Sequence, residues 1–480
     1  MNEEYFLYDG HGNIPQDITH LQFFDGYNCR TDDLPSTITH IVFGETYNQP
    51  TDHLPPSITN LVFGRNYNQP TDHLPPSVTH LIFGHDYNQP TDHLPPLVTD
   101  LTFGHNYNQP TDHLPASVTH LIFGHDYNQP TDHLPASVTH LNFVHDYNQH
   151  TDHLPTSVTN LTFGWNYNQP ADHLPPNITD LTFGGSYNHT SDHLPTSIIN
   201  LVFGYYYSCK TDHLPISVTD LTFGHNYNQP TDHLPVLVMN LTFGYYYNQP
   251  TDYLPSSLTS LGFGCYYNQP TDHLPASIKH LRFDTNYNQP TDYLPSSITH
   301  VEFSSNYNQV TDHLPSSIKV VIFSYSYTQP TNHLPPNITH LAFGRYYETP
   351  ILKLPSSLTH LYLGFSYNDT VEVLSQLPHL THLRLGYYFN KPIRQLPPTL
   401  TYLEFDSNGD KQYLDDVCSH YNLTFVGGRV YKMDKYVNRN AHNKNIKSLS
   451  LITVGVELLF DINIDVDKNI YDQDPWDWTW

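Results

Sequence analysis

A 20-residue period constrains the fold of this chain more than any other feature of its sequence. From Leu21 to Leu361 an aliphatic residue returns at every twentieth position, eighteen times in all. After an insertion of two residues the same slot returns at Leu383 and Leu403, which makes twenty units. A fixed period of this length indicates a repeat array in which each unit packs against its neighbours in the chain. The several globular domains that 480 residues would otherwise suggest are therefore not expected.

Each unit contains the pattern of a short, half-buried strand. In the segment from Ile58 to Phe63, apolar residues stand at the positions of the L-x-x-L-x-L arrangement of leucine-rich repeats. Because side chains alternate along a strand, Leu61 and Phe63 are expected to point inward, and Asn60 and Val62 outward.

Proline excludes an ordinary helix from the return path of each unit. Pro50, Pro55 and Pro56 each lack an N–H donor and restrict the residue before them, and only thirteen residues lie between Pro56 and Pro70. The return path is therefore expected to consist of turns and extended chain. The sequence predicts an all-β, leucine-rich-repeat-like solenoid with a right-handed coil and one parallel sheet. At a strand spacing of roughly 4.8 Å, its twenty coils would form a rod on the order of 95 Å long.

Five columns that hardly vary between units are predicted to fill the interior. In one unit they are Leu54, Ile58, Leu61, Phe63 and the body of Tyr67, whose hydroxyl is expected to reach the surface. Burying one such side chain stabilises the fold by roughly 1.5–3 kcal/mol. A single coil is too small to fold alone, so the stack depends on contacts between neighbouring coils.

The chain is expected to divide into four parts. Residues 1–20 form an N-terminal cap, and residues 21–405 form the solenoid. Residues 406–432 are predicted to form a small α+β cap, in which a helix over Lys411–Asn422 precedes a hairpin. Residues 433–480 form a tail that is first basic, then apolar, and finally acidic and rich in Trp.

Composition argues against several classes of partner. The formal net charge is −27 and only 19 residues are Lys or Arg, which does not suit nucleic-acid binding. A mostly apolar run from Leu449 to Phe460 alternates like a strand and is too short to cross a membrane as a helix. The four cysteines follow no pairing motif, and the N-terminus shows no apolar signal segment. We therefore expect a cytoplasmic monomer with no small-molecule substrate.

The repeat resembles a known family. The unit from Tyr67 to Gly84 reads Tyr-Asn-Gln-Pro-x-x-x-Leu-Pro-x-Ser-Val-Thr-His-Leu-x-Phe-Gly and is similar to the FNIP repeat, and the resemblance extends over residues 14–405. This family is known mainly from social amoebae and from giant DNA viruses of amoebae, and its fold is considered leucine-rich-repeat-like. In many members an N-terminal F-box recruits a ubiquitin ligase while the repeats hold the target. Here the repeats begin at Ile14, so the resemblance implies a member without an F-box, which would act in the host cytoplasm if it is viral.

Two polar columns suggest a metal site at first sight. Asp recurs at every twentieth position from Asp32 to Asp312, beside a His column that runs from His53 to His173. A metal ion needs three or more ligands that converge from different directions, whereas a ladder offers parallel side chains in one line. We therefore predict no metal and no cofactor.

The polar columns are instead expected to support the turns. Asp52 is predicted to accept a hydrogen bond from the Leu54 N–H in an Asx-turn. The column of Asn68 is predicted to form a ladder that satisfies backbone groups. No nucleophile, base and orienting group stand out together from the repeat, so no catalytic residues are predicted and the chain is not expected to be an enzyme.

Partner recognition is expected at the columns that vary between units, because interior positions cannot change freely. These columns occupy the outward strand positions and the position just after the strand. The candidate partner-binding residues are Asn60, Val62, His80, Ile82, His85, Asp100, Thr102, His105, His120, Ile122, His140, Asn142, Trp165, Tyr205, Tyr245, Arg282 and Glu302. The competing interpretation is that these columns vary by neutral drift on a surface that binds no partner.

The sequence favours a non-catalytic scaffold that binds a host or viral protein on its exposed strand face. The acidic surface favours a basic partner. One alternative is a substrate receptor for a ubiquitin ligase that acts through the C-terminal lid and tail. A second alternative is a repeat surface that binds a metal or a glycan.

Overall fold

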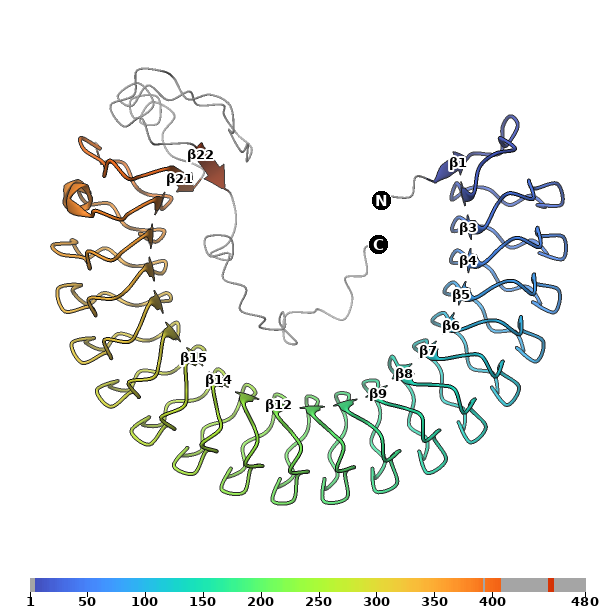
Figure 1. Cartoon of the computed structure of the whole chain (residues 1–480), viewed down its shortest axis with the longest axis horizontal. Coiled ribbons are helices and arrows are strands. Elements are labelled where there is room, and N and C mark those ends of the chain that lie inside the picture. Colours follow the sequence, from blue (N-terminus) through green and yellow to red (C-terminus); the bar gives the residue numbers. More distant parts are fainter. Residues whose placement is uncertain (1–4, 392, 407–447, 453–480) are drawn as a thin grey trace. The chain divides into compact units, whose positions relative to one another are not determined.

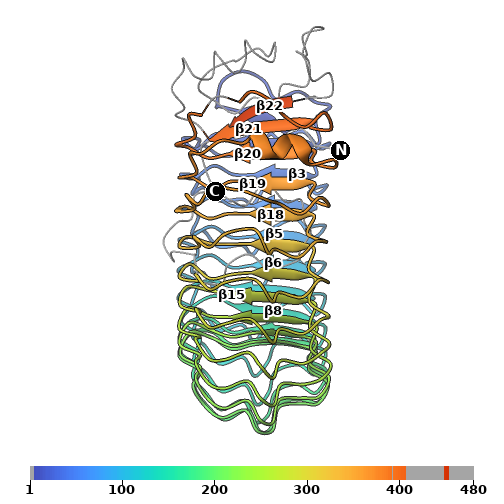
Figure 2. The ribbon, with the colours of Figure 1, turned by 90° about the vertical axis from the view of Figure 1, so that its left-hand side faces the viewer.

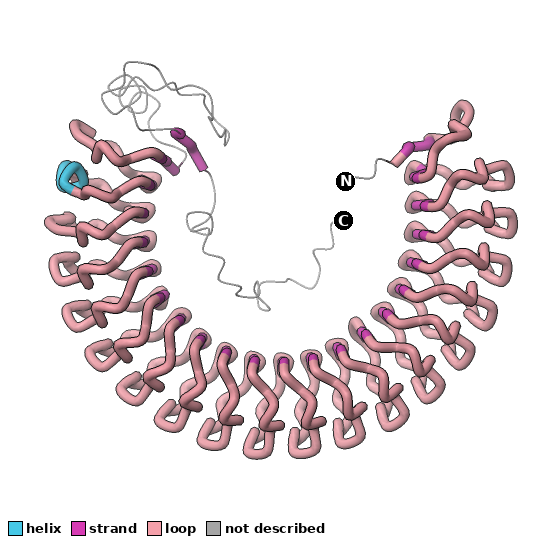
Figure 3. Tube along the Cα trace, viewed as in Figure 1, coloured by secondary structure: helices cyan, strands magenta, loops and turns pink. Residues whose placement is uncertain are grey.

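The computed structural model describes residues 5–391, 393–406 and 448–452, and the chain falls into two units, residues 1–324 and 325–480. Each repeat forms one coil with a single short strand, and nearly all of the rest is loop (Figure 1, Figure 3). The strands of the first unit are β1 (Phe6–Tyr8), β2 (His20–Phe23), β3 (His40–Val42), β4 (Asn60–Val62), β5 (His80–Ile82), β6 (Asp100–Thr102), β7 (His120–Phe123), β8 (His140–Phe143), β9 (Asn160–Thr162), β10 (Asp180–Thr182), β11 (Asn200–Val202), β12 (Asp220–Thr222), β13 (Asn240–Thr242), β14 (Ser260–Phe263), β15 (His280–Phe283), β16 (His300–Glu302) and β17 (Val320–Ile322). The second unit contains β18 (His340–Ala342), β19 (His360–Tyr362), the 3₁₀-helix η1 (Glu372–Gln376), β20 (His382–Leu385), β21 (Tyr402–Asp406) and β22 (Ser448–Ile452).

The strands within each unit pair in parallel with an offset of one repeat. In the first unit, Leu181 of β10 lies opposite Leu201 of β11, and the flanking residues follow in the same register. In the second unit, the coil that carries the two-residue insertion places Leu361 of β19 opposite Leu383 of β20. Figure 2 shows β18 to β21 running in the same direction. The parallel, leucine-rich-repeat-like solenoid predicted from the sequence is confirmed.

The interior consists of the columns that the sequence predicts. Ile58 and Leu61 are 0% exposed and Phe63 is 3% exposed. The Phe63 ring stacks on Tyr67 of its own coil, with centroids 3.7 Å apart, and lies 5.7 Å from Phe83 of the next coil. Each coil therefore covers the apolar surface of its neighbour, as expected for units that are too small to fold alone.

The tyrosine hydroxyls are buried, so the prediction that they reach the surface is wrong. Tyr67 is 0% exposed, and its Oη lies 3.0 Å from Oγ1 of Thr51, which is itself buried. The same hydrogen bond joins Thr71 to Tyr87 in the next coil. A buried hydroxyl needs a partner, and here the preceding coil supplies it. The sequence argument considered each unit by itself and missed this contact between coils.

Polar columns at the turns also join successive coils. The Asn68 backbone N–H donates to Oδ1 of Asn48 at 2.9 Å, which confirms the predicted asparagine ladder. The Asx-turn predicted at Asp52 is wrong, because in the described part of the chain the Leu54 N–H makes no hydrogen bond to this carboxylate, which is exposed to solvent. In the equivalent turn of the next coil, the Leu74 N–H donates to the backbone carbonyl of Thr71 at 3.4 Å. A turn closed by the backbone leaves the carboxylates in water, where their mutual repulsion is screened.

Within the first unit the coils splay apart, and the strands line the inner side of an arc (Figure 1). On the outward strand face, the rings of His120 and His140 are 4.3 Å apart. In the interior, the rings of Tyr107 and Tyr127 are 6.1 Å apart. Hydrogen bonds hold neighbouring strands about 4.8 Å apart, so the wider spacing of the interior rings bends the stack. The straight rod expected from strand spacing alone is therefore wrong within this unit.

A glycine follows the strand in most coils because two backbones approach each other closely there. A Cβ at Gly184 would overlap the carbonyl oxygen of Gly164 in the preceding coil. By contrast, a Cβ at Gly262, on the outward strand face, would lie 3.6 Å from Thr242, an ordinary contact distance. The close approach explains why glycine recurs in the column that follows the strand, where the exceptions in the first unit are Phe24, Val144, Asp284, Ser304 and Ser324.

Strands at both ends extend the sheet of their own unit. β1 pairs with β2, with Phe6 opposite Leu21, and covers the first repeat. β22 pairs with β21 and overlaps the first residues of the apolar run from Leu449 that the sequence predicts to be a strand. The predicted helix over Lys411–Asn422, the hairpin after it and the tail beyond residue 452 lie outside the described residues. No helix in the described part of the chain is both long and apolar enough to cross a membrane.

Candidate binding surface

The outward strand face of the first unit presents most of the candidate residues. They lie on β4 to β8, β15 and β16 and comprise Asn60, Val62, His80, Ile82, Asp100, Thr102, His120, Ile122, His140, Asn142, Arg282 and Glu302. All of them are half-buried or exposed, while the leucine, valine and phenylalanine side chains that alternate with them are buried. Two are apolar yet substantially exposed, since Ile82 is 39% and Ile122 37% accessible. The predicted inward and outward alternation is therefore confirmed.

Polar side chains on this face pair between adjacent coils. The Asp100 carboxylate lies between two histidines, 3.5 Å from Nε2 of His80 and 3.6 Å from Nδ1 of His120. Further along, Nε of Arg282 lies 3.4 Å from Oε2 of Glu302. Burial, and to a lesser extent the neighbouring His120, lowers the pKa of His140.

The other candidate residues lie just after the strand, where rings stack from coil to coil. We call this row the aromatic edge, and it consists of His85, His105, His125, His145, Trp165, Tyr205, His225 and Tyr245. The four leading histidines stack with centroids 4.4, 4.3 and 4.0 Å apart. Tyr205, His225 and Tyr245 stack at 4.1 and 4.4 Å. Trp165 lies over Gly185, where a Cβ would overlap its indole ring, and approaches Tyr205 at 5.8 Å.

A second set of tyrosines widens one end of this edge. Tyr206, Tyr246 and Tyr266 are 46%, 43% and 46% exposed. The Tyr246 ring meets Tyr245 edge to face at 5.1 Å and lies 5.1 Å from Tyr266. We define the tyrosine cluster as Trp165, Tyr205, Tyr206, Tyr245, Tyr246 and Tyr266. It places several exposed aromatic rings on one small part of the first unit.

Polar side chains border the tyrosine cluster. A shallow depression is lined by Tyr246 and Tyr266 together with Ser208, Asn226, Asn228 and Asn248. Asparagine amides both donate and accept hydrogen bonds, so the depression offers polar contacts beside apolar ring faces. This combination suits a polypeptide segment that carries both apolar side chains and backbone amides.

The sequence identified only part of this cluster. Trp165, Tyr205 and Tyr245 were among the candidate residues, but Tyr206, Tyr246 and Tyr266 were not. Their column holds Asn or Asp in most other coils of the first unit. The replacement of Asn or Asp by Tyr in this column could have identified these three residues. It did not stand out, because the repeats differ at many other positions as well.

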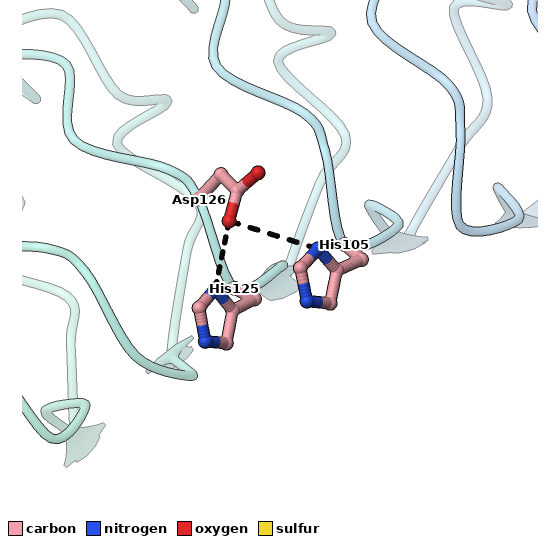
Figure 4. A group of neighbouring side chains, drawn as sticks. All are labelled: His105, His125 and Asp126. Carbon is pink, nitrogen blue, oxygen red and sulfur yellow. Dashed lines mark hydrogen bonds and ion pairs between the residues drawn. The ribbon is translucent and has the colours of Figure 1, made fainter.

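Two columns also converge at one point of the aromatic edge. Figure 4 shows the carboxylate of Asp126 facing both His105 and His125. Its Oδ1 lies 2.7 Å from Nδ1 of His125 and 3.6 Å from Nδ1 of His105. His125, His145 and Asp146 form a similar group one coil further on. From the sequence, His105 was named but the others were missed, because metal binding was considered only for the Asp column that starts at Asp32 and the His column that starts at His53.

The outward column is less accessible in the second unit. Tyr362, Arg384 and Glu404 are 4%, 2% and 1% exposed. Nε of Arg384 lies 3.5 Å from Oε1 of Glu404, and its guanidinium stands 4.8 Å over the Tyr362 ring. These three side chains are therefore buried, whereas the equivalent side chains of the first unit are half-buried or exposed.

One solved structure shows a similar fold, and a second match is more distant. The structure of CroV588, described as a novel circular LRR protein, is 33% identical, with a TM-score of 0.62, and the match covers 82% of this chain and 76% of that one. YopM from Yersinia enterocolitica WA-314 is 17% identical, with a TM-score of 0.40, over 84% of this chain and 91% of that one. No curated protein sequence matches.

A family model for the FNIP repeat matches almost the entire solenoid. The matches cover residues 47–86, 71–106, 87–126, 107–146, 147–186, 171–206, 190–226, 227–266, 267–306, 291–326, 329–366 and 367–408. The resemblance noted in the sequence is thereby confirmed, and the twenty-residue coils described above are the structural form of this repeat. The chain belongs to the FNIP repeat family and has a leucine-rich-repeat-like solenoid fold.

Proposed function

We propose that this protein is a non-catalytic scaffold that binds a host or viral protein with the strand face and aromatic edge of its first unit. Repeat solenoids of this kind are typical of protein-interaction scaffolds. The observation that carries the proposal is the tyrosine cluster, where Tyr206, Tyr246 and Tyr266 remain between 43% and 46% exposed. Tyr and Trp are enriched among the few residues that dominate binding energy at protein interfaces. An exposed aromatic group beside hydrogen-bonding amides is the expected centre of such an interface.

The division between constant and variable columns supports this proposal. Phe, Tyr and Leu inside the coils are restricted by packing, and the glycine after the strand is restricted by backbone contact in the coils that carry it. The outward positions meet neither constraint, so they can change without loss of the fold. Binding specificity can therefore be set by these positions while the coil remains the same.

Charge supports a basic partner. The chain carries a net charge of −27, and the carboxylates of Asp100, Asp180 and Asp220 lie on the outward strand face. An acidic surface increases the rate at which a basic partner associates, and this effect weakens as salt rises. We therefore expect binding to be sensitive to ionic strength.

Free thiols at Cys29, Cys209 and Cys265 are consistent with a reducing compartment such as the cytoplasm.

Removal of exposed rings from the tyrosine cluster tests the proposal. We expect the triple variant Tyr206→Ala, Tyr246→Ala, Tyr266→Ala to bind its partner at least about 30-fold more weakly, because loss of one hot spot costs about 2 kcal/mol. The measurement is quantitative affinity purification from host lysate with the full-length protein, followed by titration of the recovered partner.

A matched control separates binding from general loss of tyrosine. Tyr253 and Tyr293 are each 71% exposed and lie outside the cluster. Their double replacement by Ala should leave the same partner bound with unchanged affinity. Retention of all specific partners by the triple variant would exclude the tyrosine cluster as the binding surface.

A further inference from the structure

We propose that the aromatic edge contains a binding site for a transition-metal dication of the Zn²⁺ type, which goes beyond the proposed role in protein binding. We call it the His/Asp cluster, and it consists of His105, His125, His145, Asp126 and Asp146. Two imidazole nitrogens and one carboxylate oxygen form the set of ligands that the ion would use. Nitrogen ligands combined with a single carboxylate are suited to Zn²⁺ and its neighbours in the first transition row.

The ligand atoms are close enough for one ion. One ring nitrogen each of His105 and His125 and one carboxylate oxygen of Asp126 all lie within 4.8 Å of one another. The carboxylate oxygen is 2.7 Å from one nitrogen and 3.6 Å from the other. In a tetrahedral site with bonds of about 2.0–2.1 Å, ligand atoms are roughly 3.3 Å apart. The observed separations lie on both sides of this value, so small side-chain rotations suffice.

The ligands approach from two directions, which a single ladder cannot provide. The two histidine rings stack in parallel with centroids 4.3 Å apart, while Asp126 reaches across them from the adjacent column (Figure 4). The three side chains are between 33% and 41% exposed, so an ion can enter from solvent. A fourth position is left for water or for a side chain of a bound protein.

Electrostatics favours a cation at these coils in particular. Asp126 and Asp146 occupy the same column one coil apart, at roughly 5 Å, where two carboxylates repel by about 1 kcal/mol even in water. Elsewhere in this column an amide relieves the repulsion: Asn106 Nδ2 donates to Asp86 at 3.2 Å, and Asn166 Nδ2 donates to Asp146 at 2.8 Å. Asp126 has no such amide in the next coil, because Asp146 stands there. A dication held by Asp126 would be neutralised by these two carboxylates together.

The neighbouring coils lack one part of the set. For the pair of His85 and His105, the residue equivalent to Asp126 is Asn106, whose amide oxygen lies 2.9 Å from Nδ1 of His105. After His145, the histidine column continues with Trp165. Among the described residues, the two overlapping groups are the ones whose ligand atoms converge in this way. His125 belongs to both groups, so the cluster should hold one ion and not two.

Titration of the full-length protein with Co²⁺ tests the site, because a four-coordinate Co²⁺ ion gives intense visible absorption and a six-coordinate ion gives only weak bands. We expect the intense bands to saturate at one equivalent and to disappear when Zn²⁺ is added. His125→Ala should abolish them. Asp126→Asn should weaken binding at least about tenfold, since even changes in groups behind the ligands cost about 10–100-fold.

The His133→Ala variant is the control for Co²⁺ binding by histidines outside the cluster. This exposed residue lies in the neighbouring turn and outside the cluster, so its loss should leave the Co²⁺ spectrum unchanged. Thermal unfolding of each variant shows whether the fold is intact. A wild-type protein that gives only weak six-coordinate bands, or a His125→Ala variant that binds Co²⁺ like the wild type, would overturn the proposal. Neither result bears on the tyrosine cluster, which lies in other coils.

Discussion

Replacement of Phe163 with Ala should lower the free energy of unfolding by about 3–5 kcal/mol. The Phe163 side chain is 2% exposed and stacks on Tyr167 with ring centroids 3.7 Å apart. It also lies 5.7 Å from Phe183 and 6.0 Å from Phe143 in the adjacent coils. Removal of this ring leaves a cavity that three neighbouring rings border, and the backbone contacts between coils restrict collapse around it.

Urea unfolding followed by circular dichroism measures this loss, and Phe24→Ala provides the control. Phe24 is 60% exposed although it follows the buried Phe23 directly in sequence. Its replacement should change the free energy of unfolding by less than about 0.5 kcal/mol. Equal unfolding curves for Phe163→Ala and Phe24→Ala would contradict the assignment of the phenylalanine column to the interior.

Alkaline pH should unfold the protein sharply, because the tyrosine column is buried in its neutral form. Twelve tyrosines from Tyr47 to Tyr267 are among the largest fully buried side chains. Burial raises the pKa of Tyr47 and of Tyr167 from 10.0 to about 12, although their hydrogen bonds with Thr31 and Thr151 oppose the shift. Burial raises the pKa of the other tyrosines in the column as well, for example that of Tyr107.

The sign of the effect follows from proton binding. Above pH 10 an unfolded chain releases tyrosine protons that the folded chain retains, so stability falls as pH rises from 10 toward 12. Each buried tyrosine contributes a slope of about 1.4 kcal/mol per pH unit. Because many act together, a rise of about one pH unit should suffice to unfold the stack.

A pH titration that records tyrosinate absorbance and circular dichroism together checks this prediction. The buried tyrosines should ionise in the same narrow step in which the strand signal disappears. Full ionisation near pH 10 with the strand signal retained would show that the tyrosine hydroxyls are accessible to solvent.

The period made the interior predictable from the sequence. The columns of Leu61 and Phe63 recur in so many units that the inward direction of their side chains follows from strand alternation alone. The asparagine ladder followed in the same way, because Asn68 and Asn48 are equivalent residues of adjacent coils.

Contacts between different columns could not be predicted in this way. The Thr51 to Tyr67 hydrogen bond, and the splay of the coils in the first unit, depend on how rings of a given width pack between strands. The convergence of His105 and Asp126 likewise depends on the shape of the turn after the strand. A sequence period fixes which residues are equivalent, but not which columns meet.

The candidate surface was predictable only where it departs from the repeat. Trp165 stood out because no other described coil has Trp at this position. Tyr206 and Tyr246 did not stand out, since tyrosine is abundant throughout the chain and their exposure depends on the turn that presents them.

Engineered disulfides test most directly the claim that residues twenty positions apart are neighbours in parallel strands. In a background with Cys29, Cys209, Cys265 and Cys418 replaced by Ser, one variant carries Thr102→Cys with Ile122→Cys. Thr102 lies opposite Ile122 in the pairing of β6 with β7, so the Cα atoms should be about 5 Å apart and a disulfide can form. A second variant carries Thr102→Cys with Asn142→Cys, two coils and about 10 Å apart, which is beyond the reach of a disulfide.

Mass spectrometry of the oxidised monomers distinguishes the two outcomes. The stacked-coil fold predicts an internal disulfide in the first variant and two free thiols in the second. Free thiols in the first variant, or a disulfide in the second, would contradict the in-register stack on which the candidate binding surface and the metal site both depend.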